Sequence, residues 1–168
     1  MPVLEGVASS SWGSAQFILS RSGTLAYVAR GIDWRTNATL VWVDRRGVEQ
    51  PLTETEGPFD QPRLSPDGQR VAVVNGNPRD IWILALARDT LTRLTFDEGV
   101  DTRPVWSADG RRILFASNRN EGTVNLFWKP ADGSGAAEQL TTGVYRAVSS
   151  ISSDGNTILF RQEGEASS

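Results

Sequence analysis

Short apolar runs separated by polar turns follow one another along most of the chain. Four of them begin just after a glycine and read "TLAYVAR" (24–30), "RVAVVNG" (70–76), "RILFASN" (112–118) and "TILFRQE" (157–163). Runs of roughly four to eight residues that are bounded by turn signals and rich in β-branched and aromatic side chains are typical of strands. The pattern therefore predicts an all-β fold.

The turn before each run has a recurring form, Ser-x-x-Gly. It reads "SRSG" (20–23), "SPDG" (65–68), "SADG" (107–110) and "SSDG" (152–155), so that the glycines are separated by 45, 42 and 45 residues. Asp-Gly favours a tight hairpin because glycine accepts a positive φ and aspartate bonds to its own backbone. Such even spacing indicates an internal repeat.

Each repeat unit contains two further strands after the hairpin. The third strand is expected at 39–45, 80–86 and 125–131, and the fourth at 49–55, 91–97 and 137–143. The segment "LALARDTLTRL" (84–94) could form a helix in isolation, but its equivalents contain helix breakers, so we predict a hairpin there. Four antiparallel strands in 42 to 45 residues are typical of a β-propeller blade. A β-sandwich has no need for the same turn at this spacing.

The repeats predict one propeller domain over residues 1–168 that is only partial. We expect three complete blades and a half blade, together with a lone outer strand and linker at 1–14, in which Pro2–Val7 resembles the fourth strands. Two ways of closing the ring remain open: pairing of the N- and C-terminal strands, or dimerisation of two half-rings. The blades are expected at 15–57, 59–99, 101–143 and 145–168.

Several of these segments resemble a known family. "PRLSPDGQRVAVV" and "PVWSADGRRILFASNR" are similar to TolB-type, WD40-like propeller repeats. "RDIWILALARDTLTRLTFDEG" and "NLFWKPADGSG" resemble most the sensor propeller that follows the kinase domain in many bacterial serine/threonine kinases. The chain lacks the kinase motifs themselves, so the resemblance implies a propeller without kinase activity.

Composition narrows the possible chemistry. The chain has no His and no Cys, and a net charge of −3. Triads that use His are therefore excluded, and the charge is unlike that of a general nucleic-acid binder. We therefore predict no metal, no cofactor and no nucleic-acid partner. We also predict no membrane insertion, because no apolar run approaches the roughly 20 residues of a membrane helix. The start "MPVLEGVASSSWGS" lacks the features of a signal peptide and favours the cytoplasm, whereas the family resemblance favours the periplasm or the outside, so the compartment stays open.

Candidate site residues lie where the innermost strand of each blade is expected to line a central channel. Polar side chains at the channel mouth could hold a small ligand or a peptide end; the alternative is that they solvate the channel. The candidates for ligand binding are Gln16, Asp60, Gln61, Asp101, Arg103 and Arg146. Trp34, in a loop of the first blade, is a candidate for contact with a partner.

Other residues are expected to be structural. Trp42, Trp82, Trp106 and Trp128 are expected at repeat positions in the core. The pairs Arg45-Arg46 and Arg111-Arg112 are expected on the solvated surface.

The sequence favours a non-catalytic binding or scaffold module for a protein, a peptide or a small ligand, or for a second copy of the chain that completes the ring. Two alternatives remain. One is an enzyme or metal site in the channel, for which Asp60 and Asp101 could supply oxygens. The other is a gene fragment without an independent function.

Overall fold

The computed structural model describes residues 17–19, 25–28, 38–120, 123–143 and 146–162. Within these ranges the chain forms only antiparallel β-sheets and one 3₁₀ turn, η1 (Leu86–Arg88). The first sheet comprises β1 (Phe17–Leu19), β2 (Leu25–Val28), β3 (Leu40–Val43) and β4 (Glu49–Pro51). The second comprises β5 (Asp60–Leu64), β6 (Arg70–Asn75), β7 (Asp80–Ala85) and β8 (Thr90–Arg93). The third comprises β9 (Asp101–Trp106), β10 (Arg112–Ser117), β11 (Asn125–Pro130) and β12 (Glu138–Gln139), and β13 (Arg146–Ile151) pairs with β14 (Ile158–Gln162).

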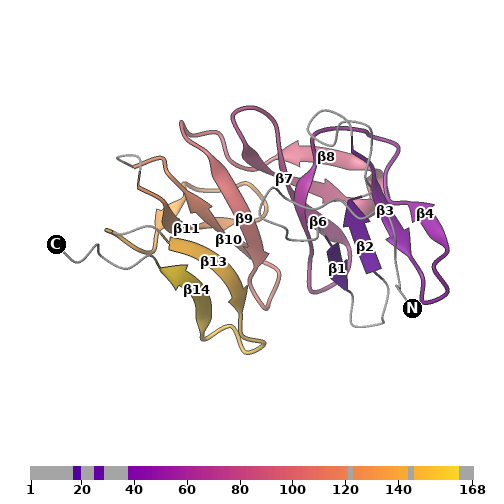
Figure 1. Ribbon diagram of the computed structural model, residues 1–168. Coiled ribbons are helices and arrows are strands. Elements are labelled where there is room, and N and C mark those ends of the chain that lie inside the picture. The colour runs from indigo at the N-terminus through magenta and orange to yellow at the C-terminus, as the bar shows by residue number, and fades with distance from the viewer. Residues whose placement is uncertain (1–16, 20–24, 29–37, 121–122, 144–145, 163–168) are drawn as a thin grey trace.

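The sheets follow one another in chain order, as the blades of a propeller do. Figure 1 shows the β1–β4 sheet at one end of the row and the β13–β14 hairpin at the other. The first strand of each sheet contacts the first strand of the next, so β1, β5, β9 and β13 are the inner strands. The predicted all-β partial propeller is thereby confirmed. Closure of the ring stays a prediction, since Pro2–Val7 lies outside the described residues.

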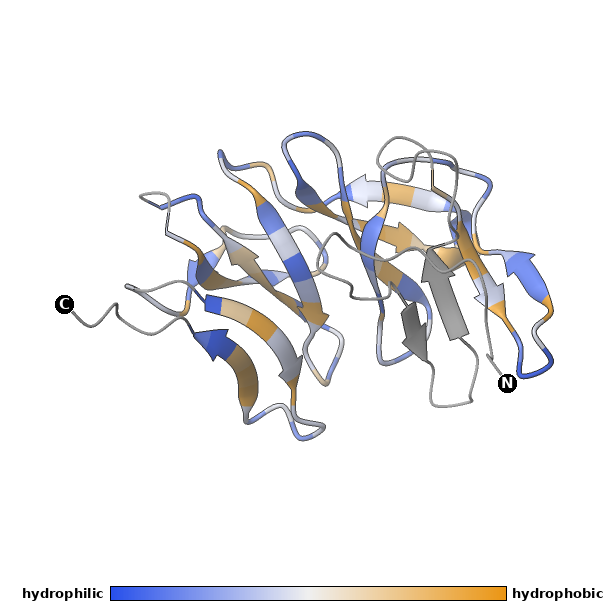
Figure 2. Cartoon of the chain, viewed as in Figure 1, coloured by the Kyte–Doolittle hydropathy of each residue, from blue (hydrophilic) through white to orange (hydrophobic). Residues whose placement is uncertain are grey.

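The core consists of apolar layers between adjacent sheets. On β6, Val71 and Val73 pack with Leu40 toward the first sheet, whereas the alternate residues Ala72 and Val74 face the third sheet. A period of two sends successive side chains to opposite faces, so each central strand is apolar on both sides. Figure 2 accordingly shows hydrophobic residues concentrated on the central strands of the second and third sheets and polar residues at the loops.

The third sheet repeats this arrangement. Ile113 and Phe115 of β10 face the second sheet, while Leu114 and Ala116 face the β13–β14 hairpin, where they pack with Val148. A sheet buried on both faces needs a neighbour on each side, and stacking along the row supplies it. No helix formed by the described residues is long and apolar enough to cross a membrane.

The Ser-x-Asp-Gly turns have the same hydrogen bonds in three successive units. In the first of them the Ser65 hydroxyl donates to Oδ1 of Asp67 at 2.5 Å and accepts the Arg70 N–H at 2.9 Å. Oδ1 of Asp67 also accepts the N–H of residue 69 at 3.0 Å, and Gly68 has a φ of +72°. The turns around Asp109 and Asp154 repeat each of these bonds. The repeated motif is therefore a structural hairpin turn. The remaining copy, SRSG at 20–23, lies outside the described residues.

The strand registers correct one expectation about the tryptophans. Trp82 pairs with Val73, and the residue of the next unit in that place is Phe127, paired with Phe115; Trp128 lies one position further along its strand. Because a shift of one residue changes the face, Trp82 packs toward the first sheet and Trp128 toward the last hairpin. These tryptophans do pack in the core, but they do not occupy equivalent repeat positions.

Candidate binding surface at the inner strands

Two bulges at equivalent points of the inner strands β5 and β9 shape the candidate surface. Gln61 has a φ of +51° and Arg103 a φ of +57°, and each lies where its strand is out of regular register with the next. Both precede a proline, Pro62 and Pro104, a position that normally favours extended backbone. Non-glycine residues held in the left-handed region cost about 1–3 kcal/mol and concentrate at functional sites.

The two bulges are joined by a hydrogen bond between sheets. The N–H of Arg103 donates to Oε1 of Gln61 at 2.6 Å, while the N–H of Gln61 donates to Oδ1 of Asp60 at 2.9 Å. The bond fixes the Gln61 side chain across the gap between the second and third sheets. Three residues that sequence analysis singled out are therefore neighbours here.

Arginine side chains surround this pair of bulges. Arg79, from the loop after β6, lies 3.4 Å from Oδ2 of Asp60, and Arg63 donates to the carbonyl oxygen of Pro62 at 2.8 Å. Burial lowers the pKa of the Arg63 guanidinium, with the positive charge of Arg103 acting in the same direction and Asp60 opposing both. The surface thus places three guanidinium groups around one carboxylate, an arrangement that suits an anionic or carbonyl-rich ligand.

Asp101 lies at the start of β9 but does not belong to this surface. Its side chain is 1% exposed and Oδ2 is 2.7 Å from the guanidinium of Arg119. That guanidinium also lies over the rings of Phe115 and Phe127, at 5.1 and 5.0 Å, and pairs with Asp97 at 2.5 Å. Asp101 is therefore part of a buried ion pair inside the third sheet.

The other candidates lie elsewhere. Arg146 begins β13, where its guanidinium donates to Oε1 of Gln162 at 3.2 Å and to the carbonyl oxygen of Thr142, and lies 5.9 Å from the ring of Phe160. It belongs to the last hairpin and not to the Gln61–Arg103 contact. Gln16 and Trp34 lie outside the described residues.

Sequence reasoning missed the arginines Arg63, Arg79 and Arg119. Arg63 could not be singled out because an arginine next to a proline carries no distinctive sequence signal. Arg79 could not be singled out because it lies in a loop far along the sequence from the starts of the inner strands. The repeated X-Pro pairs, Gln61-Pro62 and Arg103-Pro104, are the one signal in the sequence that marks both bulges. Among the described residues, no group of three or more acidic side chains is placed to hold a metal ion.

A partial propeller with a polar surface across its inner strands places the chain among β-propeller repeat proteins. The chain belongs to the TolB beta propeller domain family, whose model matches residues 20–168.

Individual relatives agree with this assignment. Over 96 residues the chain is 31% identical to a Tol-Pal system protein TolB from Wolinella succinogenes, which covers 56% of this chain and 23% of the relative. It is 32% identical over 107 residues to an uncharacterized peptidase, YuxL, from Bacillus subtilis, covering 58% of this chain and 16% of the peptidase. The structure of a putative TolB from Agrobacterium tumefaciens superimposes with a TM-score of 0.77 at 22% identity, covering 94% of this chain and 57% of the other. The chain thus spans less than a quarter of the length of these two curated relatives.

Proposed function

We propose that the chain is a non-catalytic binding module whose contact surface is the Gln61–Arg103 surface, defined here by Asp60, Gln61, Arg63, Arg79 and Arg103. The proposed partner is a protein segment that presents carboxylate or carbonyl groups. The 2.6 Å bond from the N–H of Arg103 to Oε1 of Gln61 carries the proposal, because it fixes two strained bulges side by side. A surface fixed before binding loses less conformational entropy when the ligand arrives.

The charges on this surface support a peptide as the partner. Arg79 is 44% exposed in its side chain, whereas Asp60 is 9% exposed and already accepts two bonds from Gln61. The exposed groups are hence mainly donors. Peptide carbonyls and acidic side chains are the acceptors that such donors recognise in extended segments.

The family supports a protein partner in a general way. One relative is named as a Tol-Pal system protein. The proposal for this chain rests on the inner-strand geometry, with the family as background.

A catalytic role has less support from the geometry. The two carboxylates that would supply a channel site are Asp60, paired with Arg79, and Asp101, buried against Arg119. A glycosidase-type pair needs two carboxyl groups that face one substrate. Asp101 is committed to the interior of the third sheet, so the two do not form such a pair.

Selection of peptides on the purified chain followed by calorimetry tests the proposal. We expect the selected peptides to lose about tenfold in affinity for Gln61→Ala and for Arg103→Ala. The matched controls are Gln69→Ala and Arg88→Ala, which remove the same side chains from exposed turns at the opposite end of the strands.

The melting temperature of each variant is measured first, since Gln61→Ala also removes the acceptor of the hydrogen bond that joins the two bulges. Arg79→Ala, in an exposed loop, gives a second test that leaves the bulges intact. The proposal would be contradicted by peptides that bind Gln61→Ala, Arg103→Ala and Arg79→Ala as tightly as the wild type. A selection that yields no binder would contradict it as well.

A further inference from the structure

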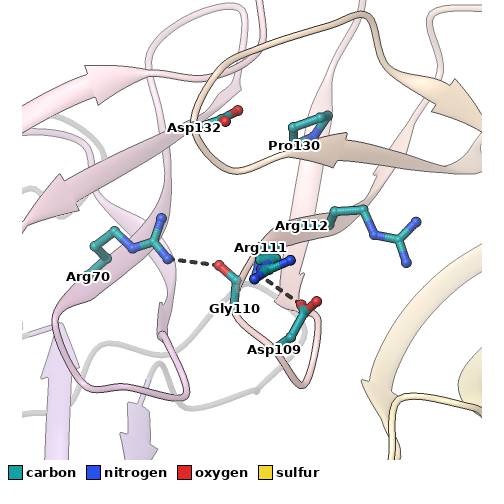
Figure 3. A pocket seen from close by; sticks show the side chains of 7 residues that line it. All are labelled: Arg70, Asp109, Gly110, Arg111, Arg112, Pro130 and Asp132. Carbon is teal, nitrogen blue, oxygen red and sulfur yellow. Dashed lines mark hydrogen bonds between the residues drawn. The ribbon is translucent and has the colours of Figure 1, made fainter.

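A pocket of about 640 Å³ lies between the second and third sheets, beside the turn that joins β9 to β10 (Figure 3). We propose that it binds the carboxylate groups of an acidic peptide. β5 and β9 begin at the Gln61–Arg103 surface and end at the turns beside this pocket. The two sites are therefore at opposite ends of the same strands, and this proposal does not depend on the first. The lining residues are Arg70, Asp109, Gly110, Arg111, Arg112, Pro130 and Asp132.

The acidic side chains of the pocket are already occupied by their own turns. Oδ1 of Asp109 accepts the Ser107 hydroxyl at 2.6 Å and the Arg111 N–H at 3.0 Å. Oδ1 of Asp132 accepts the hydroxyl and the N–H of Ser134 at 2.6 and 2.9 Å. Within the described part of the chain, neither carboxylate forms an ion pair with an arginine of the pocket. The pocket consequently has more hydrogen-bond donors than acceptors.

Two of the three guanidinium groups are held in place before any ligand binds. Arg70 donates to the carbonyl oxygen of Gly110 at 2.8 Å and lies 4.7 Å over the ring of Trp106. Arg112 lies 4.7 Å over the ring of Trp128, on the side of the third sheet that faces the β13–β14 hairpin, so its guanidinium points away from Arg70 (Figure 3). Stacking of this kind orders a long side chain and leaves donors at the edge of the guanidinium plane free for a ligand.

The third arginine, Arg111, contributes to the fold through its main chain, where its carbonyl oxygen accepts the N–H of Ala131 at 2.8 Å. The turn uses only the main-chain N–H of Arg111, and no hydrogen bond or ion pair of its guanidinium occurs among the described residues. Gln69 and Asn156 take its place in the equivalent turns and supply the same N–H. Since the equivalent hairpins form with these neutral residues, the turn does not require the charge of Arg111. After the hydrogen bonds from the serine hydroxyl of the turn and from the Arg111 N–H, that charge does help to lower the pKa of Asp109.

The pocket chemistry favours carboxylates over apolar ligands. Pro130 is the one apolar side chain among the lining residues. Arg70 and Arg111 balance the two aspartates of the pocket, and Arg112 adds one positive charge at its edge, on the side facing the β13–β14 hairpin, in a chain whose net charge is −3. A guanidinium edge offers two parallel N–H donors that match a carboxylate, and spaced carboxylates on one peptide would engage several arginines together.

Fluorescence anisotropy with a labelled decaglutamate peptide tests this site in the intact chain. We expect binding to the wild type, none to a decaglutamine peptide, and an affinity that falls as salt is raised. Arg111→Ala should weaken binding about tenfold. Arg45→Ala, which removes an exposed arginine from the β3–β4 turn of the first sheet, is the control and should leave binding unchanged.

Further variants and a competition experiment distinguish binding at this pocket from nonspecific electrostatic attraction to the chain. Arg111→Lys keeps the charge but loses the paired donors, so we expect an intermediate affinity. An equal loss in Arg45→Ala and Arg111→Ala overturns the proposal, as does absence of binding to decaglutamate. Displacement of the peptide by inorganic phosphate at an equal concentration of charge also overturns it, because the pocket would then prefer phosphate to carboxylate. Binding of peptides at the Gln61–Arg103 surface is unaffected by Arg111→Ala in either case.

Discussion

The indole N–H of Trp106 donates to the main-chain carbonyl oxygen of Arg63 at 2.8 Å, which ties the end of β9 to the inner strand of the neighbouring sheet. The ring is 6% exposed and packs in the layer between the two sheets. Trp82 offers a contrast, since its buried indole N–H has no hydrogen-bond partner within the described part of the chain. These two tryptophans thus differ in whether the donor is used.

Trp106→Phe should therefore destabilise the chain more than Trp82→Phe. We expect the first to cost about 1–3 kcal/mol, because the Arg63 carbonyl loses its partner. The second should be neutral or stabilising, because it removes a buried donor that is unpaired. Urea unfolding monitored by circular dichroism gives both free energies, and equal costs for the two variants would show that the hydrogen bond is unimportant.

Arg119→Met should be among the most damaging substitutions. It leaves the carboxylate of Asp101, 1% exposed, without its charge partner inside the third sheet. Loss of one member of a buried pair costs about 3–5 kcal/mol. The double variant Arg119→Met with Asp101→Asn should recover part of this free energy of unfolding, since the uncompensated charge is gone. A double-mutant cycle without such recovery would contradict the role given to the pair.

The turn aspartates make stability dependent on acid. The hydrogen bond from Ser65 and then that from the N–H of Gln69 lower the pKa of Asp67 below its ordinary value of 3.8, and Asp109 and Asp154 shift likewise for the same reasons. The folded pKa is below the unfolded one, so the contribution of these groups is complete above the unfolded pKa and is lost as the pH falls through the folded value. We expect Asp67→Asn to lose less stability than the wild type between about pH 5 and pH 2, measured by urea unfolding. Parallel curves would disprove the linkage.

Asp80 should act in the opposite direction. Burial raises its pKa, and the nearby charge of Asp101 adds to this, while Arg93 at 2.7 Å and the Thr95 hydroxyl oppose it. A folded pKa above the unfolded one means that the ionised group weakens the fold at neutral pH and that this penalty fades as the pH falls. The stability of Asp80→Asn relative to the wild type should hence be greatest at neutral pH and decrease on acidification. The same unfolding series at several pH values measures it.

Two glycines at positive φ should respond differently to alanine. A Cβ at Gly110, φ +68°, would meet side-chain atoms of Pro66 and Arg70 no closer than 3.5 Å, so only the backbone strain of about 1–2 kcal/mol is expected. A Cβ at Gly99, φ +130°, would lie 3.0 Å from main-chain atoms of Arg119, which cannot move without distorting the loop. Gly99→Ala should therefore lower the melting temperature clearly more than Gly110→Ala; the reverse order would contradict this account.

The sequence was sufficient for features that depend on local chemistry. Ser-x-Asp-Gly specifies its hydrogen bonds within six residues, so the turns and the strands around them were predictable. The side-chain positions were harder because they depend on register. Asp60 and Asp101 both open an inner strand, but Asp101 is at the repeat position of Phe59, which is 2% exposed, and so it points into the interior. The X-Pro pairs mark the positions of Gln61 and Arg103 in the sequence, but the left-handed backbone there opposes the usual preference before proline and depends on the contact between sheets, so its conformation could not be predicted locally.

The alternation of Val71 and Val73 against Ala72 and Val74 implies that mechanical coupling passes only from one blade to the next. A cavity opened at Val73 would loosen the first and second blades together, while the third would sense it only through the second. Amide exchange after such a substitution should thus decay with blade number along the row. A ligand that clamps two adjacent blades, at either end of their strands, would in turn stiffen the neighbours in the same graded order.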